Sequence, residues 1–137
     1  MIKLLLVFCF TFLPAYIHAF CFQQAGQRYG VSPLLLKAIA KAESNLDPTA
    51  TNHNSNGTVD VGLMQINSIW ADHLGATWDH LFDPCTNAMV GAWILSQCIK
   101  DYGSNWQAVG CYHSRTPAKR DAYAARVAQI YKAETQR

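Results

Sequence analysis

The segment "LLLKAIAKAESNL", residues 34–46, predicts an amphipathic helix. Its apolar residues Leu36, Ile39 and Leu46 recur at three- and four-residue spacing and therefore share one stripe of the helix surface. Glu43 lies in the same stripe, whereas the two lysines of the segment fall on the opposite, polar face. A carboxylate among apolar residues needs an explanation, because the chain contains only two glutamates and the helix offers other polar positions.

Helix-start and helix-stop signals flank this segment on both sides. Gly30 is a natural terminator for a helix over residues 21–29, and Ser32-Pro33 provide an N-cap and a first-turn proline for the next helix. That helix is expected to end at Asp47, because a residue before proline is displaced from helical conformation. The sequence predicts further helices over residues 66–74, from Pro84 to the residue before Gly103, and from Pro117 onward, with one short turn over residues 105–114.

The segment "TATNHNSNGTVDVG", residues 49–62, interrupts this helical pattern. Its Asn, Ser, Thr and Gly content is typical of a loop, with at most a short extended pair around Val59 and Val61. Long irregular segments in compact domains are usually functional or disordered. No strand of convincing length is predicted, so the fold class is all-α, with at most a minor β-hairpin, in a single domain.

Residues 1–19 resemble a secretory signal peptide. A positively charged start precedes the apolar run "LLLVFCFTFL", Pro14 ends that run, and we expect cleavage after Ala19. The apolar run is too short to cross a bilayer as a helix, so no stable membrane insertion is expected. Lipid attachment at Cys21 is the competing interpretation, and the bulky residue before it disfavours it. Cleavage would leave 137 − 19 = 118 residues, a single domain over residues 20–137.

Four cysteines remain once Cys9 is removed with the signal segment, an even number that predicts two disulfides in an exported chain. Four cysteines allow three pairings. We favour Cys98–Cys111, across a turn between helices, with Cys21–Cys85 tying the front of the domain to its middle. In the chain-entropy model these bonds would stabilise the fold by about 3 and about 4 kcal/mol.

No metal or other cofactor is expected. No cysteine spacing is C-x-x-C, and the histidines of the mature chain are not grouped at ligand spacing. Those histidines are His53, His73, His80 and His113. The chain has 11 basic and 9 acidic residues, a formal charge of +2 that falls to +1 without Lys3, so a nucleic-acid partner is not suggested.

Basic residues gather near the C-terminus. They form either the solvated face of a last helix or a contact with an acidic wall or a membrane surface. The residues concerned are Arg115, Lys119, Arg120, Arg126, Lys132 and Arg137.

Three short motifs together resemble those of the soluble lytic transglycosylase family. They are Ala42-Glu43-Ser44, Gly62-Leu63-Met64-Gln65-Ile66-Asn67 and Tyr112-His113-Ser114, in the family's order and over about 110 residues. The resemblance is strongest to small exported members that accompany secretion and conjugation machines. It implies a fold similar to goose-type lysozyme, and cleavage of the β-1,4 bond between N-acetylmuramic acid (MurNAc) and N-acetylglucosamine (GlcNAc), with the muramyl 6-hydroxyl as nucleophile and a 1,6-anhydro product.

The resemblance also implies roles for individual residues. Glu43 would be the sole catalytic acid and base, and the Tyr112 hydroxyl would lie against it. Ser44 either contacts the muramyl group or caps the helix end, and both readings stay open. His113 replaces an Asn that many members have, and it would titrate near pH 6.5. The residues implied to bind substrate are Ser44, Gly62, Leu63, Met64, Gln65, Asn67 and Tyr112.

The residues themselves are consistent with this chemistry. Ordinary glycosidases use two carboxyl groups, but only one glutamate lies in a motif, and Asp47 and Asp60 are not expected to act directly. An intramolecular nucleophile removes the need for a second carboxylate and holds the attacking group at high effective concentration. Apolar neighbours such as Leu36 and Ile39 would raise the pKa of Glu43 and keep it protonated for acid catalysis.

Signal and motifs together predict a periplasmic monomer that opens local gaps in peptidoglycan for an envelope-spanning secretion or conjugation apparatus, positioned there by a partner. The alternatives are a hydrolytic muramidase, in which water attacks, and a wall-binding assembly factor without turnover.

Overall fold

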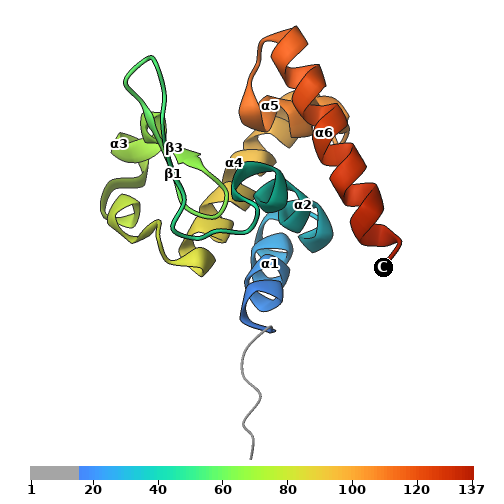
Figure 1. Cartoon of the computed structure of the whole chain (residues 1–137), viewed down its shortest axis with the longest axis horizontal. Coiled ribbons are helices and arrows are strands. Elements are labelled where there is room, and N and C mark those ends of the chain that lie inside the picture. The colour runs from blue at the N-terminus through green and yellow to red at the C-terminus, as the bar shows by residue number, and fades with distance from the viewer. Residues whose placement is uncertain (1–15) are drawn as a thin grey trace, which may run out of the picture.

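The computed structural model describes residues 16–137, with side chains from Cys21 onward. In this part the chain forms six α-helices, three short strands and two 3-10 helices (Figure 1). In chain order they are α1 (Tyr16–Tyr29), α2 (Pro33–Ser44), β1 (Thr51–His53), β2 (Val59–Val61), β3 (Ile66–Asn67), η1 (Ser68–Trp70), α3 (Ala71–Leu74), η2 (Gly75–His80), α4 (Pro84–Tyr102), α5 (Trp106–His113) and α6 (Pro117–Thr135).

The predicted signal segment lies mostly outside the described residues. Residues 1–15 are not described, and residues 16–19 belong to the first turn of α1. Cleavage after Ala19 therefore stays a prediction. No described helix combines the length and the apolar character that crossing a membrane requires.

Capping residues place the start of α2 where the sequence predicted it. Gly30 has φ of +68° after α1, and the Ser32 hydroxyl accepts a hydrogen bond from the Leu35 amide at 3.3 Å. The predicted end was wrong by three residues. Helix α2 stops at Ser44, because Asn45 adopts the left-handed conformation, with φ of 54° and ψ of 38°. Leu46, with φ of 66°, therefore lies outside the helix and does not extend its apolar stripe.

The Asn- and Ser-rich segment forms an antiparallel sheet in the order β1-β2-β3. Asn52 pairs with Asp60 across the hairpin, and Asp60 pairs with Asn67 on the other side. The all-α class with minor β-structure is confirmed, with a third short strand added to the expected pair. The predicted helix over residues 66–74 was wrong at its start, since Ile66 belongs to β3 and Ile69 is 69% exposed rather than inward.

Helix α4 runs through the centre of the molecule (Figure 1) and provides much of the core. It starts at the predicted N-cap, Asp83, which accepts a hydrogen bond from the Thr86 amide at 2.7 Å. The predicted turn over residues 105–114 is in fact an eight-residue helix, α5, capped by Asn105. Fully buried side chains of the core include Leu36, Ile39, Leu63, Met64, Ile66, Leu81, Leu95 and Val127.

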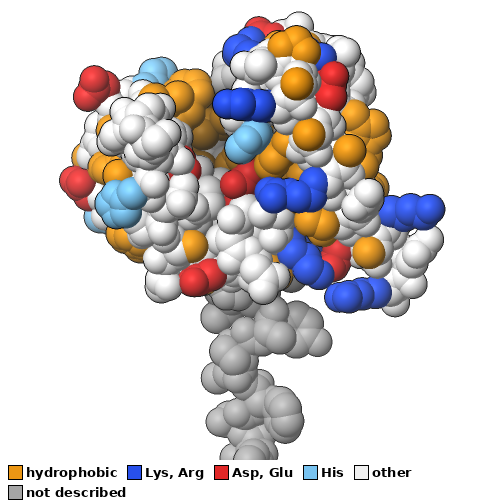
Figure 2. All heavy atoms as spheres, turned by 45° about the horizontal axis from the view of Figure 1, so that its top comes forward, with side chains coloured by type: hydrophobic (Ala, Val, Ile, Leu, Met, Phe, Trp, Pro, Cys, Tyr) orange, Lys and Arg blue, Asp and Glu red, His pale blue; other side chains and the backbone are white. Residues whose placement is uncertain are grey.

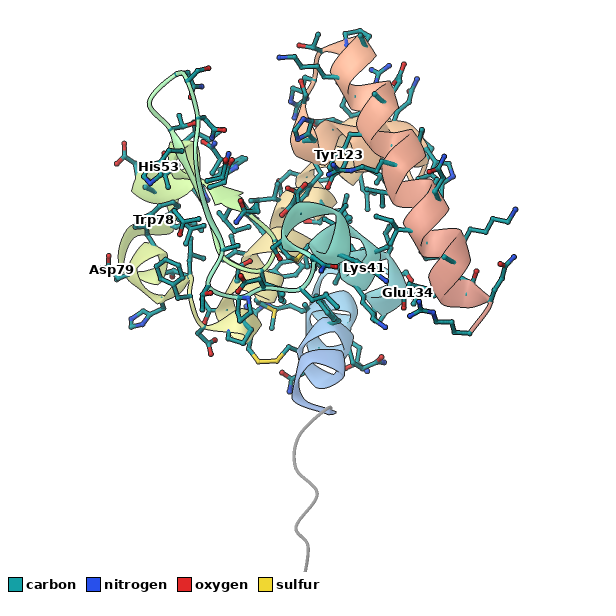
Figure 3. All side chains as sticks on the ribbon, in the orientation of Figure 1. Lys41, His53, Trp78, Asp79, Tyr123 and Glu134 are labelled. Carbon is teal, nitrogen blue, oxygen red and sulfur yellow. A yellow bond between two sulfur atoms is a disulfide. The ribbon has the colours of Figure 1, made fainter. Side chains whose placement is uncertain are left out.

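Disulfides and one ionic cluster fasten the helices together. The structure contains both favoured bonds, Cys21–Cys85 between α1 and α4 and Cys98–Cys111 between α4 and α5, with Cα–Cα distances of 5.1 and 5.8 Å. Glu134, the second glutamate, is buried on α6 and accepts hydrogen bonds from Lys37 and Lys41 of α2. Figure 3 shows Lys41 and Glu134 side by side. The lysine face of α2 is therefore partly covered by α6 and is not simply solvated.

Candidate active site

A cavity of about 820 Å³ opens between the sheet region and the α5–α6 pair. Figure 2 shows it as a hollow between two lobes of the surface. The last turn of α2 brings Glu43 to this cavity, and Tyr112 and His113 reach it from the end of α5. The sheet side contributes mainly amides, hydroxyls and one carboxylate, from Asn52, Asn54, Ser55, Asn56, Thr58, Asp60, Gln65 and Asn67.

Burial raises the pKa of Glu43 above its ordinary value of 4.5. Ile39 and Leu36, one and two turns earlier on the same stripe of α2, are fully buried, so the expected apolar surroundings are present. A hydrogen bond from Tyr123 and the positive charge of Arg126 act in the opposite direction, and the negative charge of Asp60 adds slightly to the rise. The net direction is upward, which favours a protonated carboxyl group near neutral pH.

Tyr123 is the direct partner of Glu43. Its hydroxyl donates a hydrogen bond to Glu43 Oε1 at 2.5 Å, and its ring is 4% exposed, with burial and the nearby carboxylate raising its own pKa well above 10. Figure 3 shows this side chain reaching from α6 toward the centre of the molecule. Tyr123 belongs to none of the three motifs, so its role at the site was missed.

Tyr112, which was expected to lie against Glu43, makes a different hydrogen bond. Its hydroxyl donates to the Met64 carbonyl oxygen at 2.8 Å and so holds α5 against the loop after β2. Burial raises the pKa of Tyr112 well above its ordinary value, with a further contribution from the charge of Glu43. Tyr112 lines the same cavity as Glu43, but the hydroxyl that bonds Glu43 is that of Tyr123, on α6.

Ser44 connects the end of α2 to the motif loop, residues 62–65 between β2 and β3. Its hydroxyl donates to the Leu63 carbonyl oxygen at 2.6 Å and accepts a hydrogen bond from the Asp47 amide at 3.1 Å. The cap interpretation of Ser44 therefore has direct support, whereas a contact with the muramyl group stays a prediction. Asp47 itself bonds Thr49 in the exposed turn and does not reach the cavity.

Gly62 allows the motif loop to pack closely on α4. It has φ of +77°, and a Cβ atom there would lie 2.3 Å from Asn87 Nδ2 and 2.6 Å from the Leu81 carbonyl oxygen. Leu63 and Met64, expected to line the cleft, point into the core instead, at 1% and 0% exposure. Both side chains anchor the loop in the core, and neither lines the cavity.

Gln65 and Asn67 do line the cavity, as predicted. Gln65 has φ of 52°, and its Nε2 donates to the carbonyl oxygens of Ala50 and Gly62, at 3.2 and 3.0 Å. Both amide hydrogens are thereby used, which leaves Oε1 as the atom able to accept a bond from a sugar hydroxyl. Contact of either residue with substrate stays a prediction.

Asp60 also lines the cavity, but its carboxylate is held by three amides. Oδ1 accepts from Asn67 at 2.6 Å, and Oδ2 accepts from Asn54 at 2.9 Å and from Asn52 at 3.2 Å. This network joins the three strands and occupies both oxygens. Asp60 therefore acts as a structural anion beside the cavity.

His113 stacks on the ring of Tyr123, with centroids 4.8 Å apart and planes inclined by 7°. Burial lowers the pKa of His113 below 6.5, and the charge of Arg126 lowers it further. The expected titration of His113 is therefore moved to lower pH. No group of three or more metal-ligating side chains occurs among the described residues.

A helical, lysozyme-like domain with a half-buried glutamate at an amide-lined cavity has the architecture of a glycan-cleaving domain. The chain matches the family described as "Transglycosylase SLT domain" over residues 20–134 and belongs to that family. This result confirms the resemblance read from the three motifs.

Curated relatives cover most of the chain. The "Invasion protein IagB" of Salmonella typhimurium (strain SL1344) is 43% identical over 113 residues, 80% of this chain and 71% of the relative. "Protein IpgF" of Shigella flexneri is 38% identical over 113 residues, 80% of this chain and 74% of the relative. "X polypeptide" of Escherichia coli (strain K12) is 37% identical over 140 residues, 94% of this chain and 83% of the relative.

Proposed function

We propose that the protein is a peptidoglycan lytic transglycosylase in which Glu43 is the only catalytic acid and base. The observation that carries this proposal is that Glu43, whose pKa is raised by burial, lines a cavity of about 820 Å³ in which the other carboxylate, Asp60, is held by asparagine amides. A group of this kind can donate a proton near neutral pH and, once ionised, accept one.

The proposed reaction uses the same carboxyl group twice. Protonated Glu43 gives its proton to the oxygen that links MurNAc to GlcNAc, and the bond from that oxygen to the anomeric carbon breaks. The carboxylate then takes the proton of the muramyl 6-hydroxyl. The 6-oxygen bonds to the anomeric carbon at the same time, which closes the 1,6-anhydro ring. Glu43 ends protonated, no water is consumed, and the Tyr123 hydrogen bond stabilises the ionised stage.

The state of Asp60 argues against the hydrolytic alternative. A muramidase of the usual kind needs a second carboxylate to activate water or attack the sugar. Asp60 is the other carboxylate lining the cavity, and hydrogen bonds from Asn52, Asn54 and Asn67 occupy both of its oxygens. An intramolecular nucleophile requires no such group.

Export and local wall opening form the biological part of the proposal. The signal-like residues 1–19 support a periplasmic location, and the family match begins at residue 20, next to the expected cleavage site. A relative bears the name "Invasion protein". We infer that the enzyme, acting as a monomer without a cofactor, opens gaps in peptidoglycan for a secretion or conjugation apparatus, whose components would position it.

Digestion of purified sacculi tests the proposal. The mature chain should release fragments that end in 1,6-anhydroMurNAc, lighter by one water than hydrolytic products in mass spectra. Glu43→Gln should release none, while Glu134→Gln, which changes the other glutamate, should release the same products as the unchanged protein. Reducing ends alone would establish a muramidase. If Glu43→Gln left both wall clearing and secretion intact, a non-catalytic assembly factor would be the better account.

A further inference from the structure

The two sides of the cavity differ in charge. The sheet side presents amides and hydroxyls, and its single carboxylate, on Asp60, accepts hydrogen bonds from three asparagines. On the α6 side, Lys119 lines the cavity and Arg126 lies beside Glu43. Figure 2 shows basic side chains along this side of the hollow. A substrate in the cavity therefore meets a hydrogen-bonding wall without basic residues on the sheet side and a positive wall on the other.

Three of the six basic residues of the C-terminal segment already have carboxylate partners. Arg115 pairs with Asp101, Arg120 with Asp121, and Arg137 with Glu134. Among the described side chains, no carboxylate lies within salt-bridge distance of Lys119, Arg126 or Lys132. Lys119 lines the cavity, and Arg126 lies next to it, near Glu43. The uncompensated positive charge of α6 is thus placed largely where the substrate binds.

Arg126 is held in place rather than free in solvent. Its Nη2 donates to the Ala42 carbonyl oxygen at 2.9 Å, and its guanidinium carbon lies 5.5 Å from the centre of the Tyr123 ring. Lys119, Tyr123 and Arg126 are spaced by four and three residues, so they share one stripe of α6. A guanidinium fixed in this way loses little entropy when it binds an anion.

We propose that Lys119 and Arg126 form a subsite for the carboxylates of the peptide that MurNAc carries on its lactyl group. The glycan strand is uncharged and contains acetamido and hydroxyl groups, which match the sheet side. The anionic groups of peptidoglycan near the scissile bond are the peptide carboxylates, and these match the α6 side. This inference rests on the proposed function, and it assigns the direction in which the peptide leaves the cleft: toward α6.

Binding of soluble, uncrosslinked glycan–peptide fragments tests the subsite apart from turnover. Fragments with free carboxylates and the same fragments with amidated carboxylates are titrated into Glu43→Gln protein, which should bind without cleaving. We expect tighter binding of the free-carboxylate form. Adding Lys119→Gln should reduce this preference roughly two- to fivefold, the effect of one partly exposed charge pair, and Lys119→Arg should retain it. Raising the ionic strength should weaken the preference.

Lys132→Gln in the same background is the matched control, because Lys132 is an exposed lysine of α6 outside the cavity. It should retain the preference. Equal preference in the Lys119 and Lys132 variants, or no binding of either fragment, overturns the subsite. Loss of binding to anionic phospholipid vesicles in Lys119→Gln with an unchanged fragment preference would assign the basic face to a membrane instead. Failure of the proposed function appears separately, as absence of anhydro products from the unchanged enzyme.

Discussion

At the scale of single residues, the site depends on how Glu43 is shielded from water. Burial raises its pKa, and the Tyr123 hydroxyl limits that rise by stabilising the ionised form. The two effects together leave a carboxyl group that can both lose and regain a proton. The hydrogen bond between the two residues forms only because α6 packs against α2 and brings Tyr123 to Glu43.

Tyr123→Phe should raise the pKa of Glu43 further, because it removes the hydrogen bond that favours the carboxylate. In a pH profile of kcat/KM, the alkaline limb should move to higher pH. The maximal rate should fall by about tenfold or more, since the ionised stage loses a charge-assisted hydrogen bond. Tyr131→Phe, on the same helix but outside the cavity, should leave the profile unchanged. An alkaline limb that stays in place in Tyr123→Phe would contradict this role.

Glu43→Gln should make the folded protein more stable at neutral pH. The folded-state pKa of Glu43 is raised, so its stabilising contribution is complete below the unfolded pKa and is lost as pH rises through the folded value. Glutamine removes the cost of a buried charge and still accepts the Tyr123 hydrogen bond, a gain of about 1 kcal/mol. Denaturant unfolding at pH 7 measures it, and a clear loss of stability would show that the ionised carboxylate is well solvated.

At the scale of secondary-structure elements, the motif loop is held on α4 by one buried amide. Asn87 is fully buried, accepts a hydrogen bond from the Met64 amide at 2.7 Å, and donates to the carbonyl oxygens of Val61 and Leu81, both at 2.9 Å. The same amide lies where a Cβ atom at Gly62 would have to be. Helix α4 thus fixes the loop that carries Gln65.

Asn87→Ala should cost about 3 kcal/mol or more of unfolding free energy, because it leaves buried backbone groups without partners. Asn87→Asp should be similarly harmful, since a carboxylate cannot donate to the two carbonyl oxygens. Exposed Asn56→Ala, a change in the hairpin turn, is the control and should cost under about 1 kcal/mol. Chemical denaturation compares the three variants. Equal denaturation midpoints for Asn87→Ala and Asn56→Ala would show that Asn87 does not hold the motif loop on α4.

Glu134 joins α6 to α2 through Lys37 and Lys41, at 2.7 and 2.9 Å, and these bonds lower its pKa to about 2. A lowered folded-state pKa gives stability that is present above the ordinary value of 4.5 and is lost as pH falls through about 2. Glu134→Gln should therefore cost about 1–2 kcal/mol at pH 7, since both ammonium groups remain partly in water. The difference in unfolding free energy between Glu134→Gln and the unchanged protein should vanish near pH 2. A difference that does not change with pH would show that the lost stability does not come from the ion pairs of Glu134.

Element boundaries were predictable where a cap residue marks them. Ser32, Asp83 and the proline after each start their helices as expected. The end of α2 was missed because Pro48 was given more weight than Asn45, a residue that favours the left-handed conformation at a helix end. The strand character of Ile66 was missed because two residues are too few to show an alternating pattern.

At the scale of the whole molecule, the sequence predicted the fold class, the disulfide pairing and the glutamate at the cavity, since each depends on local spacing or on short motifs. It did not predict which aromatic hydroxyl contacts Glu43, because that choice depends on how α6 crosses α2. The available signal was the four- and three-residue spacing of Lys119, Tyr123 and Arg126. The two basic residues were instead assigned to a solvated helix face or to a contact with an acidic wall or a membrane surface. The placement of amides on one side of the cavity and basic residues on the other likewise arises only when the chain is folded.

The most direct test of the central claim is a carbon-13 NMR titration of the mature protein labelled at the glutamate side-chain carboxyl carbon. The chain contains only Glu43 and Glu134, so two signals are expected, and Glu43→Gln identifies them by removing one. The Glu43 signal should titrate above 4.5 and the Glu134 signal near 2. A Glu43 signal that titrates at or below 4.5 would show a solvated carboxylate and would contradict its role as the catalytic acid.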